Sequence, residues 1–215
     1  MAQVPTGTTF QIYTSLAAAK VITAISNAAE AVVSCIGHGY ANGDVAFIES
    51  GWGRLNKRAF RLKGVTTDSY VLEGMNTTNT TYYPAGSGAG NGYKAQTPVQ
   101  ATQILSTGSS GGDPQNVEYK YIESDVRFTI NDGFSAVQRT LEIDADALGT
   151  PGYALLQALT ETGANTVLKT ILKNGSFTLT PGTVALNEEL ILQDGQVNRV
   201  RASFNATNRS TRYAS

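Results

Sequence analysis

Alternation of apolar and polar residues in the second half of the chain constrains its fold more than any other feature. From about residue 98 onward, long segments place an apolar residue at every second position, as in TLEIDADAL and VNRVRASF. Successive side chains of a strand point to opposite faces, so this pattern predicts strands with one buried and one solvated face. Turn signals at residues 131–133, 174–175 and 194–195 supply Asn or Gly, which accept positive φ. The segments therefore predict a large antiparallel sheet system.

The first part of the chain shows a second kind of β sequence, with shorter apolar runs. Five runs between residues 20 and 73 are separated by turn signals. Their spacing of about ten residues is typical of a small antiparallel barrel. A polar, glycine-rich stretch at residues 77–93 follows them and indicates a loose connection. We therefore expect two β units joined by this stretch.

Only one segment of the sequence predicts a good helix. In GTPGYALLQALTETG, Thr150 stands at the N-cap, Pro151 at the first helical position, and Gly163 ends the helix. A single amphipathic helix must bury its apolar stripe against the sheet or against a neighbouring subunit. The residues of the predicted stripe are Leu155, Ala158 and Leu159.

Charge and cysteine content exclude several classes of protein. With 16 basic and 17 acidic side chains, the net charge of −1 gives no overall positive field for nucleic acid or anionic membranes. One cysteine excludes an internal disulfide framework, and together with one histidine it excludes the usual Cys/His zinc sites. The sequence shows neither a secretory signal nor a membrane-spanning run of apolar residues. We expect synthesis inside a cell, with no cofactor, no metal and no membrane partner.

Two arrangements of residues invite a catalytic interpretation. Gly108, Ser110 and Gly112 match the bare G-x-S-x-G pattern of a hydrolase nucleophile elbow, but a predicted strand follows where the elbow requires a helix. The only cysteine, Cys35, precedes the only histidine, His38, by three positions, in the manner of a nucleophile and its base. The glycines around the histidine predict a turn between two strands instead. We therefore expect no enzymatic activity.

Charged residues gather on single faces of predicted strands. In LEIDAD, carboxylates alternate with apolar residues. In YIESDVRFTI two more carboxylates lie opposite Ile122, Val126 and Phe128 if the alternation continues across Ser124. Such a face is either a solvated surface or the lining of a passage through which nucleic acid slides without sticking. The arginines of the last long strand are either solvated or in contact with acidic groups of a neighbouring subunit. The acidic candidates are Glu123, Asp125, Glu142, Asp144 and Asp146, and the basic ones are Arg199 and Arg201.

Three aromatic residues in the first β unit leave a different function open. Trp52, Tyr82 and Tyr83 either pack in a core or hinge, or present rings on which sugars stack. The second possibility corresponds to a carbohydrate- or receptor-binding adhesin module of a virion or cell surface.

Several segments resemble the major tail tube proteins of long, flexible-tailed (siphovirus-type) bacteriophages. In the C-terminal region the resemblance is carried by YKYIESDVRFTINDGFSAVQRTLEIDADALGTPGYALLQAL and by LNEELILQDGQVNRVRASFNATN. The segment from KVITAIS to TTYYP resembles a small β module that recurs in phage tail proteins, with its turn in AVVSCIGHGYANGD and its LNKR stretch. The resemblance covers nearly the whole chain and brings no catalytic signature.

The resemblance implies a mainly β fold, an antiparallel β-sandwich or half-barrel with one flanking helix. This tube core would comprise residues 1–17 and 97–215, and residues 18–96 would form an inserted, five-stranded, barrel-like module. Six subunits would close a ring around an inner β-barrel, and stacked rings would form a tube. The candidate acidic residues would then line the lumen.

The resemblance also implies partners and a location. The protein would be part of the virion tail, synthesised and assembled in the host cytoplasm. It would contact other copies of itself and the tape-measure, tail terminator and baseplate or tip proteins, and genomic DNA would pass through the lumen without specific binding. A flexible loop at residues 105–117 would become a contact between rings, ordering on stacking. The candidate residues of this loop are Ser109, Gly111, Asp113 and Gln115.

Overall fold

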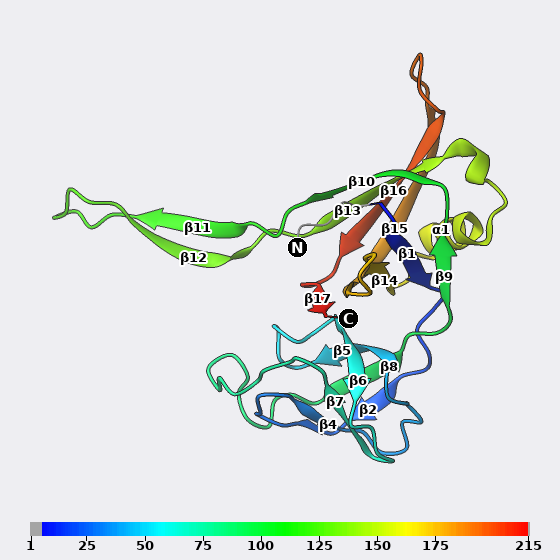
Figure 1. Cartoon of the computed structure of the whole chain (residues 1–215). Coiled ribbons are helices and arrows are strands. Elements are labelled where there is room, and N and C mark those ends of the chain that lie inside the picture. The colour runs from blue at the N-terminus through cyan, green and yellow to red at the C-terminus, as the bar shows by residue number, and fades with distance from the viewer. Residues whose placement is uncertain (1–5, 215) are drawn as a thin grey trace.

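The computed structural model describes residues 6–214, and its largest element is an eight-stranded antiparallel sheet (Figure 1). The strands run in the order β10-β13-β16-β15-β14-β1-β9, and β17 also pairs with β15. Together with one flanking helix, this curved sheet confirms the predicted mainly β, half-barrel type of fold. The strands are β1 (Thr9–Tyr13), β9 (Pro98–Ala101), β10 (Ile104–Ser110), β13 (Gln138–Asp144), β14 (Thr166–Ile171), β15 (Phe177–Ile191), β16 (Arg199–Ala206) and β17 (Thr211–Tyr213).

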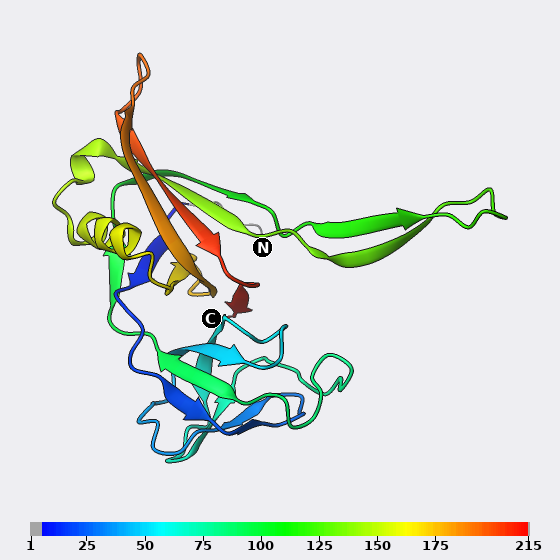
Figure 2. The ribbon, with the colours of Figure 1, turned by 180° about the vertical axis from the view of Figure 1, so that it is seen from behind.

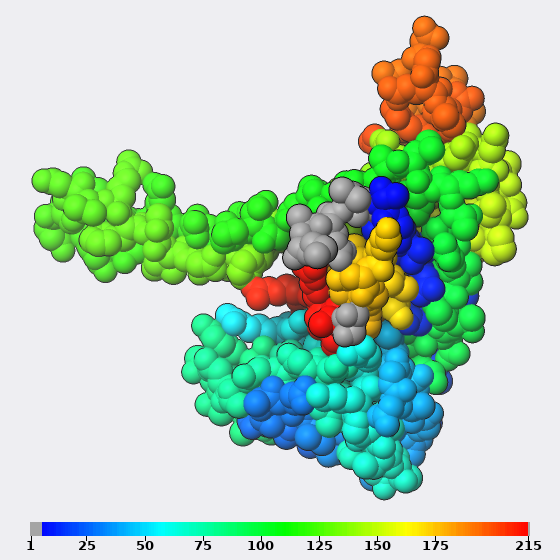
Figure 3. All heavy atoms as spheres, viewed as in Figure 1, coloured from blue at the N-terminus to red at the C-terminus, as the bar shows by residue number. Residues whose placement is uncertain are grey.

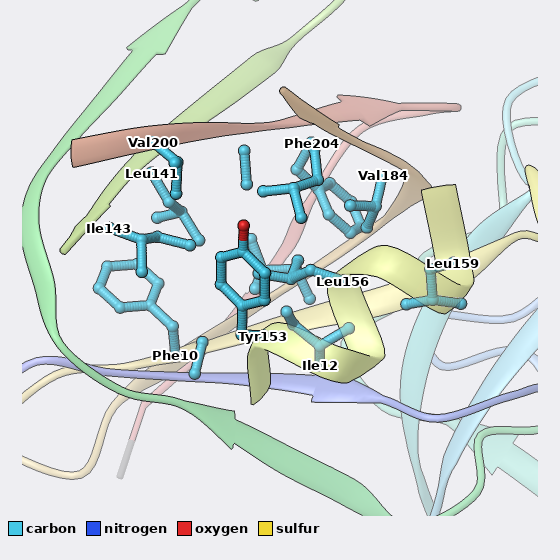
Figure 4. Close-up of a cluster of buried hydrophobic side chains, with 14 of the residues drawn as sticks. Phe10, Ile12, Leu141, Ile143, Tyr153, Leu156, Leu159, Val184, Val200 and Phe204 are labelled. Carbon is cyan, nitrogen blue, oxygen red and sulfur yellow. The ribbon is translucent and has the colours of Figure 1, made fainter. Parts of the chain in front are cut away.

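The helix, α1 (Pro151–Thr162), covers one face of this sheet and closes its core. Figure 4 shows Tyr153 and Leu156 of the helix pointing toward the side chains of the strands. Their partners from the strands are apolar and nearly all inaccessible to solvent, as the alternation pattern requires. The buried strand residues include Phe10, Ile12, Leu141, Ile143, Leu168, Val184, Val200, Ala202 and Phe204.

The helix begins and ends as the sequence predicts, but its buried stripe differs. The Thr150 side chain accepts a hydrogen bond from the Tyr153 N–H, and Gly163 ends the helix with a φ of 59°. The buried residues are Gly152, Tyr153, Leu156 and Leu159, whereas Leu155 is half-buried and Ala158 is exposed. The prediction of Ala158 in the stripe is wrong because the large Tyr153 and Leu156 side chains turn the helix toward the sheet.

Gly152 brings α1 unusually close to β9. A Cβ atom at this position would lie 2.6 Å from the Gln100 carbonyl oxygen and 2.8 Å from the Ala101 Cα. In an open helix, Gly→Ala stabilises by about 0.5–1 kcal/mol. At this site we expect Gly152→Ala to destabilise the fold by about 1–3 kcal/mol through overpacking. Urea unfolding measures the change in the free energy of unfolding, and Ala154→Gly, on the exposed side of the same turn, is the control. A Gly152→Ala variant that is more stable than the unaltered protein would contradict the close contact.

A second sheet forms a small, nearly closed barrel (Figure 2). Its seven strands run in the order β2-β8-β5-β6-β7-β4-β3, and β2 and β3 are parts of one chain segment interrupted at Thr23. The five predicted runs are all strands, but the sequence prediction missed β8, which lies in the supposed linker and joins β2 to β5. The strands are β2 (Lys20–Ile22), β3 (Ala24–Ile25), β4 (Val32–Ser34), β5 (Val45–Ser50), β6 (Arg58–Lys63), β7 (Ser69–Leu72) and β8 (Gly90–Lys94).

The barrel packs against the end of the large sheet. A shared apolar cluster crosses the junction and includes Phe47 of β5, Phe177 of β15 and Tyr213 of β17. The last segment of the chain adds hydrogen bonds: Asn208 Nδ2 donates to the Asn56 carbonyl at 2.7 Å. The junction therefore combines apolar burial with polar contacts and fixes the orientation of the barrel.

Candidate assembly surfaces

A two-stranded arm projects from the large sheet and is the most exposed part of the molecule (Figure 3). It consists of β11 (Pro114–Tyr119) and β12 (Phe128–Phe134), which pair only with each other in the described part of the chain. An isolated ribbon of two strands is marginally stable in water, and both of its edges offer unpaired backbone groups. Tyr119, Tyr121 and Phe128 form a small aromatic cluster on it.

The arm exposes apolar side chains along its whole length. Ile122 at the tip is fully exposed, and Val117 and Val126 are more than half exposed. A series of large exposed apolar residues on a slender projection is typical of an interaction surface. The full set of exposed apolar residues on the arm is Val117, Tyr121, Ile122, Val126, Phe128, Ile130 and Phe134.

The arm corrects the prediction of one continuous strand at residues 117–130. The chain reverses between Tyr119 and Phe128, so Glu123 and Asp125 lie in the tip and not on a strand face. Ser124 holds this reversal: its N–H donates to the Tyr121 carbonyl at 3.2 Å, and its hydroxyl accepts from the Val126 N–H at 3.1 Å. These two carboxylates are therefore separated from the other acidic candidates.

The prediction of a flexible loop at residues 105–117 is also wrong. Ser109 lies in β10, whose pairing with β13 continues to its last residue, and Gln115 lies in β11. Gly111 and Asp113 occupy the short break between these strands, where the chain leaves the body and enters the arm. The four residues form the root of the arm, and their role between rings stays a prediction.

The turn predicted at residues 131–133 is likewise absent. These residues lie inside β12, opposite a register irregularity between Gln115 and Asn116 of β11. The Asn131 side chain accepts a hydrogen bond from the Gly133 N–H at 3.1 Å, so the turn-forming residues make a local kink in the strand. The turns predicted at 174–175 and 194–195 are confirmed.

The outer face of β13 and β16 carries charges of both signs. Glu142 lies opposite Arg201 in the strand register, and Asp144 lies opposite Arg199. Glu142 contacts Arg201 Nη2 at 3.2 Å and Arg199 Nη1 at 3.7 Å. The pKa of Glu142 is lowered, mainly by the hydrogen bond from Ser106. The hydrogen bond from Arg201 and the positive charges of Arg199 and Arg201 lower it further. The face is polar and nearly balanced in charge, rather than acidic.

The arginines predicted for an interface between subunits thus find an acidic partner in their own chain, and an intersubunit contact stays a prediction. Asp144 and Asp146 also have local roles. Asp144 Oδ1 accepts a hydrogen bond from the Asp146 N–H at 3.0 Å and caps a short 3₁₀ helix, η1 (Ala145–Ala147). Asp146 lies on this turn, beyond the end of β13.

The catalytic candidates occupy structural positions. Cys35 is completely buried, and burial raises the pKa of its thiol, which disfavours the nucleophilic thiolate. His38 is also buried, which the sequence does not indicate; its Nδ1 accepts from the Tyr40 N–H at 2.9 Å and its ring packs on Tyr40 and Tyr70. Ser110 ends β10 and is followed by β11, not by the helix that a nucleophile elbow needs.

The three aromatic candidates for sugar binding are mostly buried. Trp52 packs edge-on against Tyr83 in the barrel core, and its indole N–H donates to the Pro84 carbonyl at 2.8 Å. Only Tyr82 is exposed, and the Arg54 guanidinium covers one of its faces at 3.3 Å from the ring centroid. The rings form no open stacking platform.

The described residues contain no helix with the length and apolar character that crossing a membrane requires. Among residues 6–214, no three carboxylate, histidine or cysteine side chains gather as a metal site would require.

Comparison with protein families gives a match over most of the chain. Residues 50–215 match the family described as phage tail tube protein, TTP. The matched region contains every strand from β6 onward, the helix and the whole arm. A comparison with curated proteins gave no match. Because the family model covers well over half of the sequence, the chain belongs to the phage tail tube protein family and is a structural subunit of the virion tail.

Proposed function

We propose that the protein forms homohexameric rings that stack into the tail tube of a siphovirus-type phage, around a channel for DNA ejection. The observation that carries this proposal is the arm, whose exposed apolar residues are covered by no part of residues 6–214. A tube in which each subunit extends an arm onto another copy would cover this surface. The contact would be heterologous, as a ring or stack requires.

The open edges of the large sheet support closure of a ring. In the described part of the chain, β10 and β9 end the sheet, and each has one unpaired edge. Exposed sheet edges promote uncontrolled association unless they are paired or covered. Pairing of these edges between neighbouring subunits would remove them and would continue the sheet around the ring.

The polar face of β13 and β16 is our proposed channel lining, with Glu142 and Asp144 on it and Asp146 at its rim. Since Arg199 and Arg201 lie on the same face, the lining would carry balanced charge instead of a strongly negative field. A surface without a net positive field releases few counterions from DNA, so the genome would slide past it without specific binding. The channel would thus need no catalytic or base-reading residue.

The remaining parts of the chain fit the same proposal. Residues 18–96 would be a module inserted into a tube core made of residues 1–17 and 97–215, displayed on the outside of the tube. The tape-measure, tail terminator and baseplate or tip proteins would be the other partners, with assembly in the host cytoplasm. No enzymatic role is proposed.

Negative-stain electron microscopy of the purified protein tests the proposal directly. We expect stacked rings with six-fold symmetry and a central channel at high protein concentration, and a smaller species on dilution. A species that stays monomeric by light scattering across the accessible range of concentration and ionic strength would contradict a self-assembling tube.

A further inference from the structure

A cleft of about 950 Å³ lies at the foot of the arm, between the barrel and the body of the molecule. Figure 3 shows this region as the notch beneath the arm. Its walls come from the arm and the segment after it (residues 131–137), from the loop before β17 (residues 206–210), and from the barrel at residues 53–54 and Arg58. The cleft is therefore formed by elements far apart in the sequence.

Three arginines line this cleft: Arg54, Arg58 and Arg209. The only acidic residue in its lining is Asp132, and none of the three arginines forms an ion pair with a carboxylate in residues 6–214. Arg209 lies over the Phe134 ring at 3.8 Å from its centroid. Stacking on a ring holds a guanidinium in place but leaves its N–H donors at the edge available.

Arg58 has no carboxylate partner among residues 6–214, although Asp132 also lines the cleft. The Arg58 guanidinium donates hydrogen bonds to Thr211 Oγ1, at 3.2 Å, and to the Met75 sulfur, and it lies 4.8 Å from the Phe60 ring centroid. Its Nε is buried without a hydrogen-bond partner in the described residues. Burial lowers the pKa of Arg58; Tyr83 and Tyr213 act in the opposite direction, and the positive charge of nearby Arg209 acts in the same direction as burial. A partly buried cation beside a like charge is costly unless an anion compensates it. The cleft is thus suited to a carboxylate.

A second projection of the same chain carries such carboxylates. The β15–β16 tip, residues 187–198, consists of the end of β15 and the loop that leads to β16, and it stands away from the body at the opposite end from the barrel (Figure 1). It contains three acidic residues and no lysine or arginine. Glu188 accepts hydrogen bonds from α1, but Glu189 and Asp194 form no ion pair within the described residues. Exposed apolar residues flank them: Leu190, Leu192 and Val197.

Charge favours this tip over the tip of the arm as the occupant of the cleft. Residues 117–127 of the arm contain three acidic and two basic side chains, and Glu118 and Arg127 already contact each other at 3.3 Å. The β15–β16 tip offers uncompensated negative charge together with apolar residues, which suit the Phe134 and Tyr83 side chains of the cleft.

We propose that, in the assembled tube, the β15–β16 tip of one copy binds in the arginine-lined cleft of another copy. Glu189 and Asp194 would supply the carboxylate partners that Arg58 and Arg209 lack, and the leucines of the tip would cover the apolar wall of the cleft. The tip and the cleft are different surfaces, so the contact is heterologous and passes from copy to copy. This inference rests on the proposed self-assembly into a tube.

Zero-length crosslinking of assembled protein tests the contact. Arg209→Lys keeps the positive charge and supplies an amine, which a carbodiimide joins to a carboxylate in direct contact, forming an amide. We expect mass spectrometry to find the new amine at position 209 joined to Glu189 or Asp194 of another copy. A crosslink from position 209 to Glu123 or Asp125, or to no carboxylate in well-formed tubes, would overturn the contact but leave the tube intact. If the unaltered protein forms no tubes, the proposed function fails and this contact fails with it.

Charge reversal gives an independent measurement. Arg209→Glu is expected to raise the protein concentration needed for assembly by about tenfold or more. Combining it with Glu189→Arg and Asp194→Arg is expected to restore assembly. Arg212→Glu, an exposed reversal on β17 outside the cleft, is the matched control and should assemble normally. Equal losses for Arg209→Glu and Arg212→Glu, or no rescue by the reversed tip, would contradict the pairing.

Discussion

Replacing Val117, Ile122 and Val126 of the arm with serine is expected to abolish tube formation while the isolated subunit keeps its stability. These side chains are 53%, 103% and 59% exposed in the single chain, so the folded subunit loses little when they become polar. When fully buried against another copy, each contributes about 1.5–3 kcal/mol. Three losses together would weaken the contact by about three orders of magnitude or more.

Sedimentation and electron microscopy measure assembly of this triple variant, and thermal unfolding measures the stability of the subunit. The matched control is Val21→Ser with Ile36→Ser, two exposed apolar residues of the barrel. The control is expected to assemble normally. Tubes formed by the arm variant at the usual concentration would contradict the arm as an assembly surface.

The sequence could predict the elements whose signals are local. Thr150, Pro151 and Gly163 bounded the helix correctly because capping depends on residues within one turn. The strands of the large sheet followed from alternation, which depends only on which face is buried. The sequence did not predict the arm because the segment around Glu123 contains no Gly, Pro or Asn-Gly to indicate a chain reversal. The Ser124 side chain stabilises the turn instead.

Glycine-rich strands were the second source of error. The sequence GNGYK is typical of a linker, yet it forms β8, and other segments of the same chain approach its glycines too closely for side chains. A Cβ at Gly90 would lie 2.1 Å from the Glu49 carbonyl oxygen, and one at Gly92 would lie 2.8 Å from the Tyr70 hydroxyl. The glycines serve close packing between strands, a tertiary requirement that composition cannot distinguish from flexibility.

The charge balance on the face of β13 and β16 could not be predicted, because it depends on how two strands far apart in the sequence pair. Glu142 and Arg201 are separated by 59 residues in the chain but lie directly opposite each other in the sheet. Sequence alone placed the carboxylates on one strand and the arginines on another, but it could not pair the two strands. The same limit applies to the arginine-lined cleft, whose walls come from the barrel, the arm and the loop before β17.

Tyr213→Ala is expected to destabilise the fold by about 3–5 kcal/mol, as for other large buried aromatic residues. Its ring is buried against Phe177 with centroids 5.1 Å apart, and its hydroxyl accepts the Arg61 N–H at 2.9 Å. Arg61 in turn pairs with Glu73 and lies 4.9 Å from the Tyr213 ring centroid. Tyr213→Phe is the matched control and should cost about 1–3 kcal/mol, because it keeps the ring but removes the hydroxyl that accepts from the Arg61 N–H and donates to the Glu73 carbonyl.

Calorimetry and limited proteolysis distinguish local from global effects of these two substitutions. We expect Tyr213→Ala to separate unfolding of the barrel from that of the large sheet and to expose the joining segments at residues 14–19 and 95–97 to protease. Equal stability of the Ala and Phe variants would show that the ring does not hold the barrel.

Because the cleft takes Arg58 from the barrel and Arg209 from the body, a loosened barrel would also pull the cleft apart. Adding Tyr213→Ala to the Arg209→Lys variant should therefore reduce the crosslink to the β15–β16 tip, although Tyr213 contacts neither of the two groups that the crosslink joins.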